Sequence, residues 1–278
     1  MIPYSFAYAA PRSLDEAVGL LAADPDGTVP VGGGTWVYPA MNRGESRPRL
    51  VLDLRGLPLA EIRYDDGIVH VGALCTYANL LRSPVVAEHA ELLRLMAGTV
   101  TGGPQLHNQG TLGGSVAAAR PASDAPAAIS ALGGHAIATG PGGRRAIPVA
   151  ELFAGAFETS LAADEILVGL EFPSTRGLRA GYYKIKTAEG GWPIATAACL
   201  VHEGARLTVA VGAVAATPFR VDTEPDRVAG DVLAALPDPW SDILAHAEYR
   251  RSVSGVAAQR AVDAALGEAA PTREGFWA

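Results

Sequence analysis

The 278-residue chain is poor in cysteine, with two residues, and in aromatic side chains, which make up 6% of it. Neither Cys75 nor Cys199 has a Cys or His partner at metal-ligand spacing, so we expect no zinc or iron–sulfur site within this chain. A disulfide between Cys75 and Cys199 is one possibility, but two unpaired, buried thiols in a reducing compartment are the simpler interpretation. The histidines are scattered, and no general acid, base, nucleophile or metal ligand is assigned.

Basic charge is also scarce, because 22 Lys and Arg residues stand against 29 Asp and Glu residues and leave a net charge of -7. Such a chain lacks the positive surface that binds nucleic acid or an anionic membrane. No stretch reaches the roughly 18 apolar residues of a membrane-spanning helix, and no basic segment followed by an apolar one opens the chain. We therefore expect a soluble, cytoplasmic protein with no nucleic-acid partner and no membrane insertion.

The length predicts two domains, and the first fifty-odd residues have the pattern of a small α/β unit. Residues 13–22 predict a helix in which Ser13 is the N-cap and Glu16 completes a capping box. A strand then leads directly into "VGGGT" at 31–35, and residues 49–57 predict a second strand.

The pattern changes after residue 62 and again near residue 177. Asp66-Gly67 predicts a hairpin turn between two strands, and residues 76–100 predict helix with a break at Ser83-Pro84. Further expected elements are a helix at 125–132, a hairpin turn at 140–143, strands at 164–173 and 206–214, and a mostly helical tail at 231–266. The boundaries fall near 56 and at 174–178.

Two glycine-rich turns stand out, "VGGGTW" at 31–36 and "GTLGGS" at 110–115. Neither is the dinucleotide fingerprint G-x-G-x-x-G, and no Lys follows the glycines as in a phosphate-binding Walker A loop. Successive glycines allow backbone N–H groups to converge on an anion, and Thr35 and Ser115 add hydroxyls. Together the turns could hold a pyrophosphate; alternatively, each is only a turn.

Asp124 lies between Pro121 and Pro126 at an expected helix start. Its side chain is either the helix N-cap or a carboxylate that accepts hydrogen bonds from sugar or ribityl hydroxyls.

A series of motifs then carries a family resemblance. They are "VGGGT" at 31–35, "PQLHNQGTLGGS" at 104–115, "PASDAPAA" at 121–128, "DEILVGLEFP" at 164–173, "GGWPIATAACL" at 190–200 and "AEYRR" at 247–251. In this order they resemble the FAD-binding medium subunit of molybdenum hydroxylases, the group of carbon monoxide dehydrogenase, xanthine dehydrogenase and aldehyde oxidase.

The resemblance implies an α+β fold. Residues 1–175 would form a PCMH-type FAD-binding domain, related to vanillyl-alcohol oxidase-like flavoproteins, with two α/β subdomains at about 1–56 and 57–175. Residues 176–278 would form a C-terminal α+β domain like that of carbon monoxide dehydrogenase flavoproteins.

The resemblance also implies which residues bind FAD. Two groups would cradle the pyrophosphate, namely Val31, Gly32, Gly33, Gly34, Thr35 and Trp36, and Gly110, Thr111, Leu112, Gly113, Gly114 and Ser115. Asp124 would bind a cofactor hydroxyl, the backbone around Leu167 would lie near the flavin, and Trp192 would lie beside the isoalloxazine or be a core residue.

Three positions depart from the family pattern. His107 replaces a common Arg, Ser115 a common Asn, and Gly191 a common Asp. Ser115 keeps hydrogen-bonding capacity, His107 can titrate near neutral pH, and Gly191 carries no carboxylate.

By the same resemblance, the chain is an electron-transfer subunit of a molybdenum hydroxylase, an oxidoreductase. A large molybdenum-cofactor subunit and a small [2Fe-2S] subunit would be its partners in a dimer of heterotrimers, and an external acceptor would take the electrons from FAD. The alternatives are a non-redox assembly subunit that has lost flavin and a stand-alone flavin oxidoreductase. The sequence leaves the substrate and the acceptor (NAD, quinone, dioxygen or a carrier protein) open.

Overall fold

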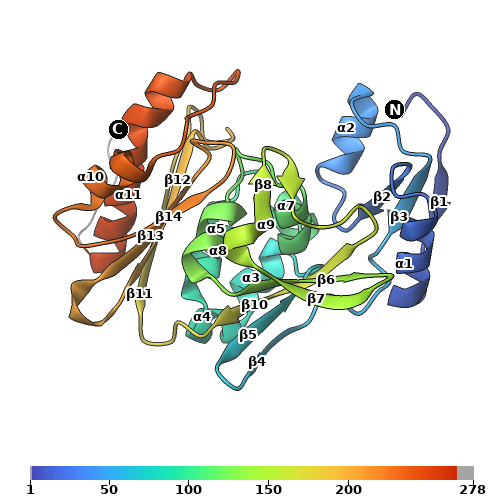
Figure 1. The fold of residues 1–278 in the computed structure, drawn as a ribbon, viewed down its shortest axis with the longest axis horizontal. Coiled ribbons are helices and arrows are strands. Elements are labelled where there is room, and N and C mark those ends of the chain that lie inside the picture. Colours follow the sequence, from blue (N-terminus) through green and yellow to red (C-terminus); the bar gives the residue numbers. More distant parts are fainter. Residues whose placement is uncertain (1, 268–278) are drawn as a thin grey trace. The chain divides into compact units, whose positions relative to one another are not determined.

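The computed structural model describes residues 2–267, which form two compact units (Figure 1). Unit 1 comprises residues 1–90, 100–120 and 133–174, and unit 2 comprises 91–99, 121–132 and 175–278, in each case as far as the structure describes them. One crossing of the chain between the units falls between residues 174 and 175. The division into domains 1–175 and 176–278 stays a prediction. Two helical segments from the N-terminal part nevertheless belong to unit 2. The end of the predicted domain 176–278 lies outside the described residues.

Unit 1 begins with a parallel three-stranded sheet in the order β1-β3-β2. Its strands are β1 (Ala7–Ala9), β2 (Thr28–Val31) and β3 (Leu50–Asp53), and its helices are α1 (Leu14–Ala23) and α2 (Val37–Arg43). Ser13 caps α1 as predicted, accepting a hydrogen bond from the Glu16 amide at 3.1 Å. The capping box is incomplete, because the Glu16 carboxylate accepts from the Arg12 amide and not from that of Ser13.

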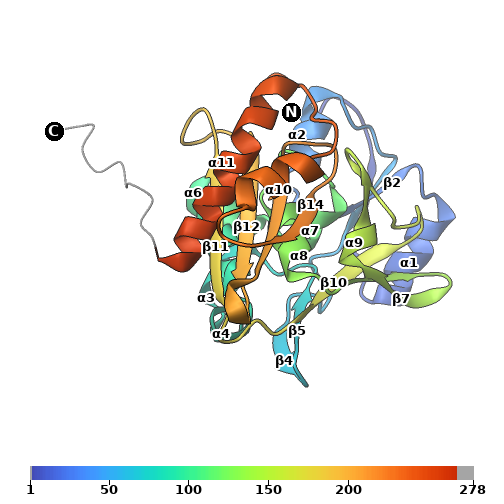
Figure 2. The ribbon, with the colours of Figure 1, turned by 60° about the vertical axis from the view of Figure 1, so that its left-hand side comes forward.

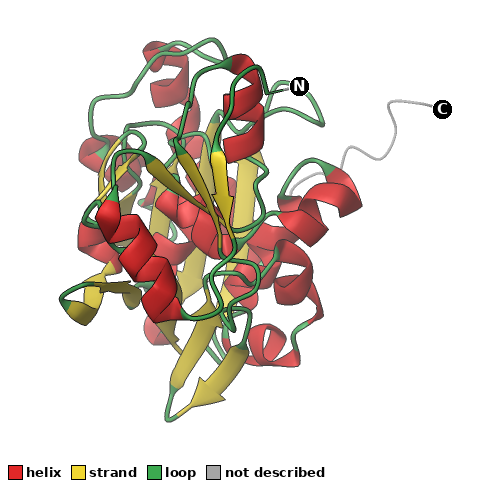
Figure 3. Cartoon of the chain, turned by 90° about the vertical axis from the view of Figure 1, so that its right-hand side faces the viewer, coloured by secondary structure: helices red, strands yellow, loops and turns green. Residues whose placement is uncertain are grey.

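The second sheet of unit 1 is antiparallel, in the order β4-β5-β10-β6-β7. The strands are β4 (Ile62–Asp65), β5 (Ile68–Gly72), β6 (His135–Gly140), β7 (Gly143–Pro148) and β10 (Ile166–Pro173). Short helices accompany it: α3 (Tyr77–Arg82), α4 (Pro84–His89), α6 (Gly103–Gln109), α7 (Leu112–Ala117) and α9 (Val149–Leu152). A small hairpin, β8 (Phe153–Gly155) and β9 (Glu158–Thr159), completes the unit. Figure 3 shows the helices, strands and loops of the chain in separate colours. Both predicted hairpin turns are confirmed.

Unit 2 is built on the antiparallel sheet β11-β12-β13-β14. Its strands are β11 (Arg179–Ile185), β12 (Ala195–Val201), β13 (Leu207–Gly212) and β14 (Phe219–Thr223). The helices are α5 (Glu91–Thr99), α8 (Ala125–Leu132), α10 (Val228–Ala235) and α11 (Ala247–Leu266), with a 3₁₀ turn, η1, at Glu203–Ala205. The long helix α11 lies along β11 and β12 (Figure 2).

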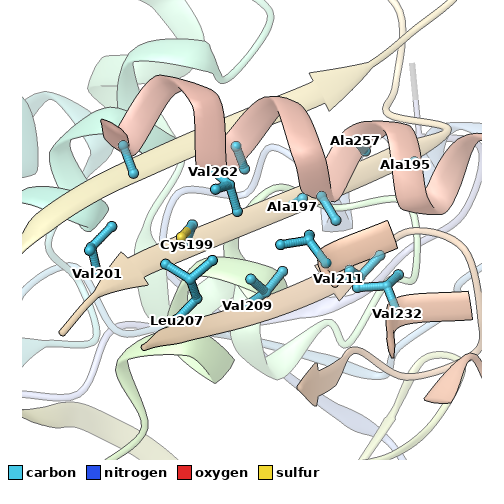
Figure 4. Packing of buried hydrophobic residues seen from close by; sticks show 14 of the residues in the cluster. Ala195, Ala197, Cys199, Val201, Leu207, Val209, Val211, Val232, Ala257 and Val262 are labelled. Atoms are coloured by element: carbon cyan, nitrogen blue, oxygen red, sulfur yellow. The ribbon is translucent and has the colours of Figure 1, made fainter. Parts of the chain in front are cut away.

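Every residue of β12 is buried, which means that both faces of this sheet are covered. Ala197 and Cys199 pack with Ala257 and Val262 of α11 (Figure 4). The opposite face meets α8, because a Cβ at Gly212 would come within 3.3 Å of the Ala127 Cβ. The side chains are small, so helices approach the sheet closely on both sides.

Several sequence predictions are confirmed, including the helix at 125–132, the break at Ser83-Pro84 and the buried strand within 206–214. Others are wrong in part. The strand predicted at 49–57 ends at Asp53, and the tail predicted as mostly helical contains a non-helical stretch between α10 and α11. The glycine-rich turn predicted at 110–115 runs into α7, which begins at Leu112.

Candidate cofactor site

The first glycine turn connects the end of β2 to the start of α2 in unit 1. Residues 32–36 are half-buried. Within residues 2–267, no backbone or side-chain acceptor pairs with the amide N–H groups of Gly32, Gly33, Gly34, Thr35 or Trp36. Several N–H groups without a protein acceptor among the described residues are therefore available to a ligand, and successive amides of this kind can bind an anion.

Close packing explains why the turn must be glycine. A Cβ at Gly33 would stand 1.7 Å from the Gln109 carbonyl oxygen, which no side chain can accommodate. Gly34 has a φ of +68°, in the left-handed region, and a Cβ there would stand 2.3 Å from the Tyr38 ring. These glycines therefore serve the protein's own packing as well as leaving the amides open.

The second turn, residues 110–115, differs because most of its amides already have protein acceptors. The N–H of Leu112 donates to the Cys75 carbonyl at 2.9 Å, and that of Gly113 donates to the Ala73 carbonyl at 3.0 Å. The Thr111 hydroxyl accepts from the Gly114 amide at 3.1 Å and caps α7. Among the described residues, the Thr111 amide has no acceptor. A role of the second turn in holding the pyrophosphate stays a prediction.

The structure brings the two turns together in unit 1. A Cβ at Gly32 would lie 3.2 Å from the Thr111 hydroxyl, and the Gln109 carbonyl lies directly against Gly33. Residues eighty positions apart in the sequence therefore form one continuous backbone surface.

Leu167 lies in β10 of the same unit, beside an irregularity in register between Leu167 and Gly169. Its side chain is buried. Next along the strand, the Val168 carbonyl accepts from the Ala73 amide at 3.0 Å, and the Ala73 carbonyl accepts from Gly113. The backbone around Leu167 is thus linked to the second turn through one residue.

A polar cluster anchors the strand beside the first turn. Asp53 pairs in register with Val31, and its carboxylate accepts from the Arg55 guanidinium at 2.6 Å and from the Tyr8 hydroxyl. The hydrogen bonds from Arg55 hold the pKa of the Asp53 carboxyl well below its usual range, although burial opposes that shift. The carboxylate therefore stays charged and joins the end of β3 to Tyr8 of β1.

Trp36, the last residue of the first turn, is packed by two residues that the sequence analysis did not single out. Its indole is stacked with the Phe157 ring, with centroids 6.1 Å apart and planes at 20°. The Arg120 guanidinium carbon lies 4.7 Å from the indole centroid. No pattern in the sequence indicates this contact, because the three residues lie on segments that only the tertiary fold brings together.

Asp124 belongs to unit 2, where it precedes α8. Its carboxylate accepts from Lys184 Nζ at 3.0 Å and from the Tyr182 hydroxyl at 3.0 Å, and its side chain is buried. Burial raises the pKa of the Asp124 carboxyl, while Lys184 and Tyr182 oppose the rise. Among the described residues, no amide of α8 donates to this carboxylate, so the N-cap interpretation is not supported. Its binding of a cofactor hydroxyl stays a prediction.

Trp192 also belongs to unit 2, in the connection between β11 and β12, and its side chain is 44% exposed. The core interpretation of Trp192 is therefore wrong. The backbone that follows is held by Arg250, which is fully buried and donates from Nη1 to the Ile194 carbonyl at 2.7 Å. Arg250 also pairs with Asp242 at 2.6 Å.

The three departures from the family pattern have definite surroundings. His107 Nε2 lies 2.7 Å from the Val100 carbonyl, so it is the donor there. Ser115 Oγ bonds to the Tyr77 hydroxyl at 2.5 Å. A Cβ at Gly191 would stand 3.1 Å from the Ala188 carbonyl, which is tight for any larger residue.

Comparisons with known proteins agree with this geometry. Residues 4–175 match the family described as the FAD binding domain in molybdopterin dehydrogenase. The carbon monoxide dehydrogenase medium chain of Hydrogenophaga pseudoflava is 31% identical, over 95% of this chain and 98% of that protein. The 6-hydroxypseudooxynicotine dehydrogenase complex subunit alpha of Paenarthrobacter nicotinovorans is also 31% identical, over 99% of both chains.

The solved carbon monoxide dehydrogenase from Hydrogenophaga pseudoflava that lacks the Mo-pyranopterin moiety contains a chain with the same fold. The TM-score is 0.89 at 30% identity, over 97% of this chain and 100% of the other. The chain belongs to the family of FAD binding domains in molybdopterin dehydrogenases, and within it to the FAD-binding medium subunits of molybdenum hydroxylases. The expected α+β fold and the FAD cofactor are confirmed.

The chemistry of the described residues fits this cofactor. FAD carries a pyrophosphate, and the open amides of the first turn are donors for its oxygens. Within residues 2–267, no group of three or more His, Cys, Asp or Glu side chains is placed to hold a metal ion. In the same part of the chain, no helix combines the length and apolar character needed to cross a bilayer.

Proposed function

We propose that this chain holds the FAD pyrophosphate with the amides of Gly32, Gly33, Gly34, Thr35 and Trp36. The observation that carries the proposal is that these five consecutive amides have no protein acceptor within residues 2–267. The Thr35 hydroxyl adds a donor, and Arg120 places a cation against Trp36. Gly110, Thr111 and Gly114 form the adjoining surface.

The remaining assignments follow the family pattern. Leu167 contributes backbone near the flavin, Asp124 accepts from a cofactor hydroxyl, and Trp192 lies beside the ring system. The exposure of Trp192 supports its role, since a buried indole would be unavailable to a ligand.

When bound, FAD accepts electrons singly and releases them as a pair, which links one-electron clusters to two-electron acceptors. The chain's own residues bind the cofactor, orient it and neutralise its phosphate charge. They supply no acid, base or nucleophile in this proposal.

We infer that the chain works in a complex with a large molybdenum-cofactor subunit and a small [2Fe-2S] subunit. Its relatives are named as medium chains or as subunits of such complexes, and they align over nearly their full length. Electrons would arrive from the clusters of the small subunit and leave to an external acceptor. We further propose that the complex is a dimer of heterotrimers. We place it in the cytoplasm, a reducing compartment in which the two free, buried cysteines would stay reduced.

The substrate belongs to the partner in this proposal. Two relatives with the same 31% identity are named for carbon monoxide and for 6-hydroxypseudooxynicotine, which are chemically unrelated. Similarity in this chain therefore does not follow the substrate.

Reconstitution tests the cofactor assignment directly. The purified full-length chain is incubated with excess FAD, freed of unbound flavin and denatured, and the released FAD is measured by absorbance. We expect one FAD per chain. A folded sample that retains no FAD would refute the proposal. Co-purification of all three subunits from the native host tests the complex.

A further inference from the structure

The ring of Phe157 contacts Trp36 although much of Phe157 is exposed to solvent. Phe157 lies between β8 and β9, and 52% of it is exposed to solvent. Burial of its ring from water therefore gives only part of the usual stabilisation. Its ring is nevertheless stacked with the indole of Trp36.

The backbone that presents this ring is strained. Phe157 has a φ of +62° and Ala119 a φ of +41°, both in the left-handed region that residues with a Cβ disfavour. The two strained residues are joined to each other, because the Phe157 N–H donates to the Ala119 carbonyl at 2.8 Å. Strain of this kind persists only where the surroundings impose it.

Both strained residues help to place a side chain against the indole of Trp36. Phe157 carries its own ring to Trp36, and Ala119 precedes Arg120, whose guanidinium lies against the same indole. Three segments of unit 1 meet there, namely the first glycine turn, the end of α7 and the β8–β9 hairpin. Trp36 is the last residue of the row of open amides, so the stack holds the side chain at the end of that row.

We propose that Phe157 is a positioning residue, which holds Trp36 and the amides before it in the arrangement that the phosphates of FAD require. The β8–β9 hairpin is then a third element of the cofactor site, beside the two glycine turns. Arg120 contributes to the same stack and supplies positive charge next to the turn. This inference rests on the proposed FAD function.

The test compares two glycine substitutions in the full-length chain. Phe157→Gly removes the ring and relieves the left-handed strain. Asp66→Gly, at a φ of +42° in the β4–β5 turn, relieves strain in the same unit without touching the stack. Each variant is titrated with FAD and its dissociation constant is measured, together with its thermal unfolding midpoint.

We expect Phe157→Gly to weaken FAD binding by about twofold to tenfold, as the loss of one aromatic pair implies, with its unfolding midpoint near that of wild type. Asp66→Gly should bind FAD like wild type, and Phe157→Tyr should restore affinity. Phe157→Leu keeps an apolar side chain but removes the ring, and it should weaken FAD binding to the same extent. This variant separates loss of the ring from any disturbance of the hairpin by glycine.

A purely structural contact would give a different result. The unfolding midpoint would fall while the folded fraction bound FAD with wild-type affinity, and this would overturn the positioning role but leave the FAD function intact. If wild type itself bound no FAD, both proposals would fail together.

Discussion

At the scale of one residue, Gly33 has two roles that both require glycine. Its missing Cβ makes room for the Gln109 carbonyl, and its amide stays open. Valine at Gly33 or Gly113 would therefore disturb packing in unit 1 as well as FAD binding, since a Cβ at Gly113 would stand 2.5 Å from the Ala73 Cβ. A side chain that supplies a hydrogen-bond donor without filling such a tight space tests FAD binding more cleanly.

Thr35 is such a residue, because its hydroxyl bonds to no acceptor among residues 2–267. Thr35→Val keeps the shape and removes the donor, so we expect FAD affinity to fall by about tenfold or more, as for a hydrogen bond to a charged group. Titration with FAD measures the change. Thr139→Val, on β6 of the same unit, is the matched control and should bind like wild type. Equal affinity in both variants would exclude the Thr35 hydroxyl from the site.

The sequence could predict the glycine turns, because glycine leaves a direct signal in composition and spacing. It could not predict Arg120 or Phe157, because nothing local marks a side chain that meets Trp36 only in the folded unit. For Asp124 the sequence suggested two interpretations from neighbouring residues. Neither included its actual partners Lys184 and Tyr182, which lie about sixty residues further along the chain.

At the scale of elements, a buried carboxylate makes the stability of the parallel sheet of unit 1 dependent on pH. The pKa of Asp53 is lowered by Arg55, so its contribution to stability is fully present above its unfolded pKa near 4. That contribution is lost as the pH falls through the folded pKa. The sheet should therefore weaken in acid.

Asp53→Asn tests this dependence through urea unfolding at several pH values. At pH 7 we expect a loss of about 1–3 kcal/mol, because charge-assisted hydrogen bonds from Arg55 are weakened. The difference from wild type should shrink steadily below about pH 4. The control Asp26→Asn changes an exposed aspartate of the same unit. A difference between Asp53→Asn and wild type that stays constant to pH 2 would contradict this account.

The contact of α11 with β11 depends on a glycine in the strand. A Cβ at Gly181 would stand 2.0 Å from the Ala261 carbonyl oxygen of the helix. We expect Gly181→Ala to destabilise unit 2 by about 1–3 kcal/mol, because the helix must move away. Gly230→Ala in α10, where nothing lies within 4 Å, should instead stabilise the chain by about 0.5–1 kcal/mol. Denaturant unfolding measures both, and an unchanged midpoint for Gly181→Ala would show that α11 can shift freely.

At the scale of the whole molecule, sequence order and compact units do not coincide. The segments 91–99 and 121–132 lie in the N-terminal part of the chain but pack in unit 2. Helical periodicity predicted α8 within its observed bounds, yet it could not show which sheet the helix covers. That choice depends on the fully buried faces of β12 and β13, which lie some seventy residues further along the chain.

A truncated chain tests this division. A fragment of residues 1–175 leaves α5 and α8 without the sheet that they cover, so their buried apolar side chains would face water. We expect the fragment to aggregate or to unfold without cooperativity in urea, whereas the full chain unfolds cooperatively. A monomeric fragment with a sharp transition would instead support an independent domain ending at residue 175.

The central claim is that the amides of residues 32–36 bind FAD, and hydrogen exchange measured by mass spectrometry tests it most directly. Without FAD these amides have no acceptor in the described part of the chain and should exchange rapidly. On saturation with FAD, we predict slower exchange in peptides that cover residues 32–36, while the already bonded amides of Leu112 and Gly113 change less. Stoichiometric FAD binding with unchanged exchange at residues 32–36 would contradict the account.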